Sequence, residues 1–301
     1  MPERALRHPL VFVLLAAAVL AAALATPGSP ENDFYFAILG DRTGGAAPEI
    51  YGRVWREIAL LHPAFVINVG DTIEGGDDAR AEADWESPRA VWRRYARYPV
   101  FLVPGNHDVW SEPSRALYEK HAGRPLTYSF NHQNAHFTVL DNSRTLELSP
   151  DQLRFLAADL EANRERAPKF VFFHKPFWVA YLKVGSGEFE LHRLVRKYGV
   201  SYVVSGHIHR FTRATRDGVS YITVGSSGAA IGKSAPGDDL FRKGSFYHHV
   251  WIRVRRAAAD FTVKELAPPA GLGRMFPASD WDEQGPHFDP ADPALAAAPE
   301  T

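Results

Sequence analysis

Five short apolar runs, each closed by polar residues, organise the chain as far as residue 209. They cover residues 34–39, 64–69, 99–103, 169–173 and 200–205. Runs of this length bounded by turn residues are typical of buried strands. Between the first two runs, apolar residues recur at the spacing of an amphipathic helix, at Ile50, Val54, Ile58 and Leu61. The alternation of strand and helix predicts a parallel βα arrangement.

Other stretches predict further helices and a change of sheet type. Helices are expected over residues 48–62, 77–97, 114–121 and 189–198, and another begins at Ser149-Pro150 with the serine as N-cap. Residues 128–130 and 136–140 predict a hairpin with His132 in its turn. After residue 209, antiparallel strands are expected over 210–216, 219–224, 246–255 and 261–266. A parallel half followed by a β-rich half favours two sheets packed face to face, with helices outside.

Residues 1–25 form a segment of their own. Arg4 and Arg7 precede an uncharged run over residues 10–24, and Ala23-Leu24-Ala25 offers a small-residue cleavage site. This pattern is typical of a secretory signal peptide, and the alternative is an uncleaved N-terminal anchor. The run is short of the ~20 residues that a membrane span needs, which favours cleavage. We therefore expect an exported protein, periplasmic or extracellular, with membrane contact only if the segment is retained.

The rest of the chain divides by composition. Residues 26–33 are expected to be a linker, and 34–266 the folded domain. Residues 267–301 are rich in Pro and Ala and lack periodicity, which predicts an irregular tail with a disordered tip. Trp281 and Phe288 are available to pin this tail to the surface.

Charge and cysteine content narrow the chemistry. The chain has 301 residues, a formal net charge of −1 and no cysteine. Near-neutral charge without a long basic run argues against a general nucleic-acid surface, which needs cations to neutralise phosphates. The lack of cysteine excludes disulfides and thiolate ligands, so a metal site must use nitrogen and oxygen donors.

The residues that close the five runs are such donors. They are Asp41, Asp71, Asn106-His107-Asp108, His174 and His207-Ile208-His209. Because the carboxyl ends of parallel strands meet at one edge of a sheet, these side chains are expected to converge. Carboxylate, amide and imidazole groups bind hard and borderline divalent cations. The pattern predicts a metal site at the C-terminal edge of the strands, with Ile208 turned into the core.

The series Gly-Asp, Gly-Asp, Gly-Asn-His-Asp, His and Gly-His-x-His, in this order, resembles the calcineurin-like metallophosphoesterases over about residues 34–266. The resemblance implies a four-layer α/β/β/α sandwich of two facing sheets. It implies two divalent metal ions that clamp a phosphoester and generate a hydroxide at neutral pH. The implied reaction is hydrolysis of a small phosphomonoester or phosphodiester.

The resemblance also implies a role for each donor. Asp71 bridges the metals, Asp41 and His209 bind the first metal, and Asn106, His174 and His207 bind the second. His107 is not expected to be a ligand. It would face the leaving group as a general acid or stabilise the transition state, with Asp108 orienting it.

One position departs from the family pattern. The first motif usually reads Asp-x-His, with the histidine on the first metal, whereas this chain has Asp41-Arg42-Thr43. A threonine hydroxyl is a poor ligand for a divalent cation, so we expect weak occupancy of the first site. The donors suit Mn, Fe or Zn, and the missing imidazole favours Mn. The departure keeps a second interpretation open: a degenerate, non-catalytic protein of the same fold that binds phosphate or metal.

Arg42 itself has two interpretations of equal weight. Its guanidinium suits a phosphate group, with the backbone N–H groups of Gly44 and Gly45 as partners, and it equally suits a surface salt bridge. Residues 225–243 form a long connection that either walls the substrate pocket, with Lys233, Arg242 or Lys243 facing an anion, or is a mobile surface loop.

The other histidines are not expected to be ligands. His136 lies in a predicted strand and is expected to pack inside. His248 and His249 face opposite sides of another predicted strand, so at most one of them can point toward the site.

Overall fold

The computed structural model describes residues 33–184, 188–232, 239–266 and 273–290. The expected signal peptide or anchor, nearly all of the expected linker, Lys233 and the tip from residue 291 lie outside these ranges. Within the described ranges, no helix combines the length and the hydropathy needed to cross a bilayer.

The first of two six-stranded sheets carries three of the five predicted strands. β1 (Asp33–Leu39), β2 (Val66–Asn68) and β3 (Val100–Leu102) run parallel to one another. On the other side of β1, the sheet continues with β10 (His248–Arg255), β11 (Ala258–Glu265) and β12 (Met275–Pro277), each antiparallel to its neighbour. β1 therefore lies inside the sheet, and its residues 36–39 are buried, as their apolar run predicted.

The second sheet has the order β4-β5-β6-β7-β9-β8. β4 (Tyr128–His132) and β5 (Ala135–Val139) form the predicted hairpin, although His132 lies in the strand and not in the turn. β6 (Lys169–Phe172) and β7 (Tyr202–Ser205) follow in parallel. β8 (Thr212–Arg216) and β9 (Val219–Thr223) are antiparallel, as predicted, but β9 is also parallel to β7, a pairing that the sequence pattern did not predict. A hairpin signal reports only the neighbour along the chain, and the β7 pairing is not local.

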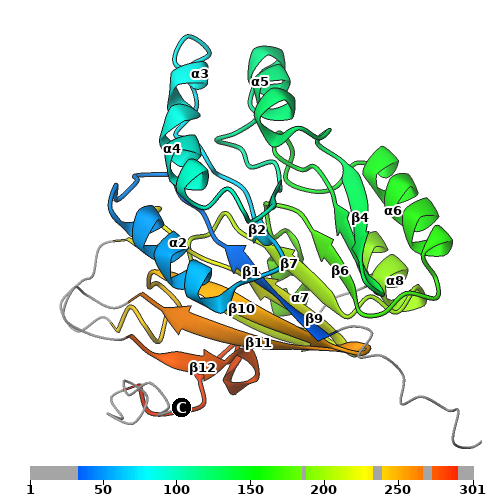
Figure 1. Ribbon diagram of the computed structural model, residues 1–301. Coiled ribbons are helices and arrows are strands. Elements are labelled where there is room, and N and C mark those ends of the chain that lie inside the picture. The colour runs from blue at the N-terminus through cyan, green and yellow to red at the C-terminus, as the bar shows by residue number, and fades with distance from the viewer. Residues whose placement is uncertain (1–32, 185–187, 233–238, 267–272, 291–301) are drawn as a thin grey trace, which may run out of the picture. The chain divides into compact units, whose positions relative to one another are not determined.

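Phenylalanine side chains fill the space between the sheets. Phe36 of the first sheet lies edge-on to Phe137 and Phe170 of the second, with 5.4 Å between ring centroids in each pair. Edge-on aromatic pairs add about 0.5–1.5 kcal/mol beyond their buried area. Helix α2 (Ile50–Leu61) packs on the outer face of the first sheet, and α6 (Pro150–Ala162) and α8 (Glu190–Lys197) pack on that of the second (Figure 1). These four layers confirm the predicted α/β/β/α sandwich.

Helix boundaries differ from the prediction at two places. The helix expected over 77–97 is two helices, α3 (Ala81–Asp84) and α4 (Glu86–Arg94), which meet at the buried Trp85. Pro88 has no N–H to donate to the Asp84 carbonyl, so one regular helix cannot run through this point. Helix α7 (Trp178–Val184) follows β6 and was not predicted. Ser149 caps α6 as predicted, because its hydroxyl accepts a hydrogen bond from the Gln152 N–H at 3.3 Å.

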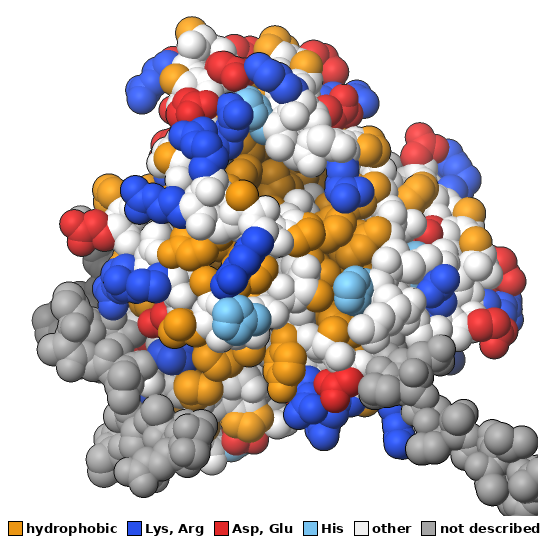
Figure 2. Space-filling view, in the orientation of Figure 1, with side chains coloured by type: hydrophobic (Ala, Val, Ile, Leu, Met, Phe, Trp, Pro, Cys, Tyr) orange, Lys and Arg blue, Asp and Glu red, His pale blue; other side chains and the backbone are white. Residues whose placement is uncertain are grey.

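Charges of both signs are interspersed around α3, α4 and α5 (Glu112–Ala122), as Figure 2 shows. Lys120 of α5 pairs with Glu82 of α3 at 2.9 Å, and Arg89 pairs with Glu86 within α4 at 2.8 Å. Exposed pairs of this kind contribute at most about 1 kcal/mol each. The expectation of no general nucleic-acid surface stays a prediction.

The described part of the C-terminal tail belongs to the fold, which corrects the expectation of an irregular arm. Residues 275–277 form β12 and pair with β11. The short strands β13 (Trp281–Asp282) and β14 (Gly285–Pro286) pair with each other. Trp281 is only 2% exposed and packs edge-on against Phe211. Strands of two or three residues are too short to show periodicity, so the sequence pattern ended at residue 266 while the folded structure continues.

Candidate metal centre

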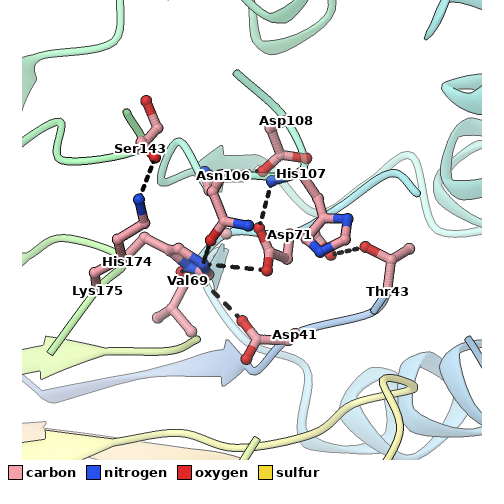
Figure 3. Close-up of polar contacts among 12 residues, drawn as sticks. Asp41, Thr43, Val69, Asp71, Asn106, His107, Asp108, Ser143, His174 and Lys175 are labelled. Atoms are coloured by element: carbon pink, nitrogen blue, oxygen red, sulfur yellow. Dashed lines mark hydrogen bonds and ion pairs between the residues drawn. The ribbon is translucent and has the colours of Figure 1, made fainter. Parts of the chain in front are cut away.

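The predicted donors come together at strand ends that belong to both sheets. In the first sheet, β1, β2 and β3 lead into Asp41, Asp71 and Asn106, and in the second sheet β6 and β7 lead into His174 and into His207 and His209. Figure 3 shows the side chains of Asp41, Asp71 and Asn106 directed toward His174. The centre therefore lies where the C-terminal edges of two sheets meet, and not at the edge of one parallel sheet.

His174 is the meeting point of these side chains. Its Nε2 lies 3.2 Å from Asp71 Oδ2 and 3.2 Å from Asn106 Oδ1. Its Nδ1 lies 2.8 Å from the Val69 carbonyl, which can only accept, so Nδ1 carries the proton and Nε2 faces the site. Orientation of a metal-binding imidazole through its other nitrogen is usual in metal sites. Asp71, His174 and His207 offer ligand atoms within 4.8 Å of one another.

Burial and neighbouring charges shift the pKa values of His174, Asp71 and Asp41 in different ways. Burial works to lower the pKa of His174, but the carboxylates of Asp71 and Asp41 raise it to about 9. Burial works to raise the pKa of Asp71, but the His174 imidazole lowers it to about 2. These two residues thus form a charged pair. Asp41 is different, because burial raises the pKa of its carboxyl well above the ordinary value.

Asp41 tests whether the residues fit a cation. Both of its carboxylate oxygens are buried, and neither has a hydrogen-bond partner among the described residues. A buried carboxylate without hydrogen bonds is costly, and a divalent cation satisfies it. His209 Nδ1 donates to the Ala230 carbonyl at 2.8 Å, which leaves Nε2 free at 3.7 Å from Asp41 Oδ2. The donors and the orphaned oxygens fit a divalent metal ion.

Three of the predicted ligands have left-handed backbone conformations. Their φ angles are 52° at Asp71, 72° at His207 and 50° at His209. Such conformations cost of order 1–3 kcal/mol for residues other than glycine and are found at functional sites. They also correct the expectation for Ile208, which is half-buried and lines a surface cavity of about 330 Å³ with Trp178 and Trp281 instead of entering the core. A loop with left-handed residues does not follow the simple alternation of a strand.

Thr43, where the family usually has a ligand, is turned away from the centre. Its hydroxyl lies 2.9 Å from the Asp71 carbonyl and 2.6 Å from the Ile73 carbonyl, and the residue is 1% exposed. Its backbone N–H also donates to the Asp71 carbonyl, at 3.1 Å. Thr43 therefore ties the loop after β1 to the loop after β2.

Asp108 does not orient His107, which corrects the implied pairing. Its carboxylate accepts hydrogen bonds from the backbone N–H groups of Thr72, Ile73 and Gly105 at 2.7, 3.1 and 3.0 Å. His107 is held instead by the Glu74 carbonyl, 2.5 Å from Nδ1, and its own N–H donates to Asp71 Oδ1 at 2.9 Å. The free Nε2 of His107 lies on the side of Gly44 and His209. Asp108 shapes the loop, and His107 alone faces the site.

Arg42 does not form the predicted surface salt bridge within the described residues. Its guanidinium donates to the Thr72 carbonyl at 2.9 Å and to the hydroxyl of Ser87, and it lies 5.5 Å from the centre of the Tyr51 ring. These partners connect the loop after β1 to the loop after β2 and to α4. A role for Arg42 in binding phosphate stays a prediction that these contacts do not support.

Sequence reasoning missed Asn142, which supports His174. Its Oδ1 accepts the backbone N–H groups of His174 and Lys175 at 3.1 and 3.0 Å. A signal was present, because the predicted strand 136–140 is also closed by polar residues, Asp141-Asn142-Ser143. Residues 225–230 were also missed as a support, since the alternatives weighed for them were a pocket wall and a mobile loop. They form hydrogen bonds with Asp41 and His209.

The remaining histidines lie in the framework. His136 is buried as predicted, and its Nε2 lies 2.9 Å from Asp159 Oδ2. His248 and His249 are both fully buried. His248 bonds to Phe246 and Gly225, and His249 bonds to Glu57. None of these three belongs to the cluster of ligand atoms found in the described residues.

Comparisons with known proteins agree with this geometry. The family model described as calcineurin-like phosphoesterase matches residues 34–211. Purple acid phosphatase 15 of Arabidopsis thaliana is 25% identical over an alignment of 168 residues that covers 46% of this chain and 32% of that protein. The match thus spans about a third of the length of this plant relative.

Two solved structures share the fold at low identity. A dimetal phosphatase from Danio rerio has a TM-score of 0.55 at 15% identity, over 79% of this chain and 96% of that one. GAP50, the anchor in the inner membrane complex of Plasmodium, has a TM-score of 0.56 at 16% identity, over 82% of this chain and 88% of that one. At these identities the likeness shows the fold alone.

Proposed function

Because the chain belongs to the calcineurin-like phosphoesterase family, we propose that it is a metal-dependent phosphoric ester hydrolase acting on a small phosphomonoester or phosphodiester. The observation that carries the proposal is the pair of buried Asp41 oxygens that have no hydrogen-bond partner among the described residues, set beside His209 and the cluster of Asp71, His174 and His207. A structural core has no use for such a carboxylate, whereas a cation-binding centre needs it.

The residues present are suited to hold two divalent ions. We propose that Asp71 bridges the two ions, that Asp41 and His209 bind the first, and that Asn106, His174 and His207 bind the second. Two ions bound there would neutralise the phosphate charge and lower the pKa of a water molecule. We propose Mn as the metal, because hard oxygen donors form half of the set.

His107 is the residue proposed to act on the leaving group. The Glu74 carbonyl fixes the proton on Nδ1 of the neutral ring, so Nε2 can be protonated and can then donate that proton to the departing oxygen. Because the backbone N–H of the same residue is bonded to Asp71, the ring is positioned relative to the metal ligands. General acid catalysis of this kind contributes about 10²–10⁴-fold to the rate.

The proposal includes export to the periplasm or the extracellular space. It is supported by the apolar run over residues 10–24 with Arg4 and Arg7 before it and a small-residue cleavage site after it. Expression of the full chain in a bacterial host, followed by fractionation and N-terminal sequencing, tests it. Mature protein that begins at or shortly after residue 26 supports export by cleavage, and a full-length chain in the cytosolic fraction contradicts it.

The alternative is a non-catalytic protein of the same fold. Two observations favour keeping it: Thr43 replaces a usual ligand, and the fold is shared by GAP50, which is described as an anchor. Turnover of p-nitrophenyl phosphate and bis-p-nitrophenyl phosphate, measured against added Mn²⁺, decides between the two and separates monoesterase from diesterase. Turnover that rises with Mn²⁺ and is abolished in Asp71→Asn supports the enzyme. Absence of turnover in protein shown to bind Mn²⁺ supports the alternative.

A further inference from the structure

Residues 225–230, here called the 225–230 loop, connect Asp41 and His209, the two donors proposed to serve the first metal alone. The Gly225 carbonyl accepts the N–H of Asp41 at 2.8 Å, and the Asp41 carbonyl accepts the N–H of Ser227 at 2.9 Å. At the other end of the loop, the Ala230 carbonyl accepts Nδ1–H of His209 at 2.8 Å. One short loop therefore fixes the backbone of one donor and the ring of the other.

Gly225 is packed between the two chain segments that carry these donors. A Cβ on Gly40 would lie 1.7 Å from the Gly225 carbonyl oxygen. A Cβ on Gly225 would lie 2.8–2.9 Å from backbone atoms of His209 and Arg210. With no side chain between these backbones, a displacement of Gly225 must move Asp41 and His209 as well.

His248 holds Gly225 from the neighbouring strand β10. Its Nδ1 lies 2.8 Å from the Phe246 carbonyl, which only accepts, so Nδ1 carries the proton and Nε2 accepts the Gly225 N–H at 3.1 Å. The ring is fully buried, and burial lowers the pKa of His248 to about 4, which keeps the imidazole neutral near pH 7. The His248 carbonyl also accepts the hydroxyl of Ser227, which in turn accepts the Gly40 N–H, each at 2.9 Å.

We propose that His248 is a positioning residue for the first metal: by holding Gly225, it keeps Asp41 and His209 in the arrangement that a cation needs. The inference rests on the proposed function in that the centre binds metal ions. It follows from the position of Thr43, which adds no side-chain donor to Asp41, His209 and the shared Asp71, so that affinity depends on how well these donors are preorganised. His248 bonds to the loop and not to the donors themselves.

The test is a calorimetric titration of the metal-free full chain with Mn²⁺, in wild type and His248→Phe. Phenylalanine keeps the ring and removes the acceptor for Gly225. We expect affinity in the weaker of two binding classes to fall by about tenfold or more, the range seen when partners of metal ligands are removed, and the stronger class to keep its affinity. His248→Gln, which restores an acceptor, should recover part of the loss.

His192→Phe is the matched control. His192 is also fully buried, and it is bonded to Tyr221 and Asp217 at 2.8 and 3.0 Å, with no bond to the 225–230 loop. The His192→Phe substitution should lower thermal stability without changing Mn²⁺ affinity. The inference is overturned if His192→Phe loses as much Mn²⁺ affinity in the weak class as His248→Phe does. It is also overturned if His248→Phe loses affinity equally in both classes.

Further outcomes are also decisive. If His248→Phe does not fold, Ser227→Ala must show the same selective loss at smaller size, and unchanged affinity in Ser227→Ala overturns the inference. If the Mn²⁺ affinities of both binding classes are the same in wild type and in His248→Phe, this inference is overturned, and the proposed metal centre is not affected. A wild-type protein that binds no Mn²⁺ overturns the proposed metal centre, and this inference with it.

Discussion

The His174 side of the centre and the Asp41 side are held by different kinds of contact. On the His174 side, the donors touch one another, since Nε2 lies 3.2 Å from both Asp71 Oδ2 and Asn106 Oδ1. On the other side, the Asp41 carboxylate has no hydrogen bond among the described residues, and His209 stays 3.7 Å away. The side chain of His209 is 22% exposed, whereas that of His174 is fully buried.

This difference indicates how each side depends on metal. His174 and Asp71 neutralise each other, so their arrangement is stable before an ion binds. Asp41 has only longer contacts with charged groups, at 3.8 Å to His174 and 3.7 Å to His209, and its backbone is held by hydrogen bonds to the 225–230 loop. We therefore expect one tight and one weak metal position, with the weak position on the Asp41 side, and protein purified without added metal should carry clearly fewer than two ions.

The largest effect is expected from Asp71→Asn, because both sides share this residue. Both Mn²⁺ classes and the phosphoesterase activity should be lost, since the amide carries no charge to share between two cations. Asp41→Asn should remove the weak class only. Calorimetry and p-nitrophenyl phosphate turnover measure these losses, with circular dichroism as the control for folding. Equal loss of both classes in Asp41→Asn would contradict the division into two sides.

His107→Ala should come next, slowing turnover by ~10²-fold or more while metal binding persists. The loss should be larger for substrates with poor leaving groups, which need protonation most. Comparison of p-nitrophenyl phosphate with an alkyl phosphate measures the difference. An equal loss for both substrates would mean that His107 only positions the phosphate.

A smaller effect is expected from lowering the pH, which acts on His248, the residue proposed to support the Asp41 side. The pKa of buried His248 is about 4, against about 6.5 when unfolded. Because the unfolded chain takes up this proton first, the contribution of neutral His248 to stability is intact above pH 6.5 and declines as the pH falls toward 4, by up to about 3 kcal/mol in total. Urea unfolding of metal-free wild type should therefore depend more steeply on pH in this window than that of His248→Phe. Parallel profiles would argue against the neutral, buried imidazole.

The smallest effect is expected from Thr43→Val, which keeps the shape of the side chain and removes its hydroxyl. Loss of the bond to the Asp71 and Ile73 carbonyls should lower the free energy of unfolding by about 1 kcal/mol. Thr43→Ser, which keeps the hydroxyl, should lose less. Mn²⁺ affinity should change little, because the hydroxyl points away from the centre, and a marked loss of affinity in Thr43→Val would show that it reaches the metal.

Much of the fold and of the donor set could be predicted from local pattern. Apolar runs closed by polar residues located five parallel strands and the residues that follow them, because burial and chain reversal act within a few residues. The same rule failed for β12 and Trp281, where the strands are too short to show a period. It also failed for Ile208, because left-handed residues on both sides change the direction of its side chain.

The roles of the supporting residues could not be predicted, because their partners are far along the chain. Asp108 was expected to orient His107 from the next position, yet it bonds to backbone N–H groups some 35 residues earlier. Arg42 was expected to bind phosphate or to form a surface salt bridge, and its partners are Thr72 and Ser87.

By itself, the sequence determined which donors this protein has, that they follow strands, and that the position two residues after Asp41 lacks an imidazole. Only the tertiary structure decided which sheet each donor comes from and what holds it. The imidazoles of His107, His174 and His209 are oriented by the backbone carbonyls of Glu74, Val69 and Ala230. Every residue has a backbone carbonyl, so a contact of this kind leaves no mark in the amino-acid sequence and exists only once the chain has folded.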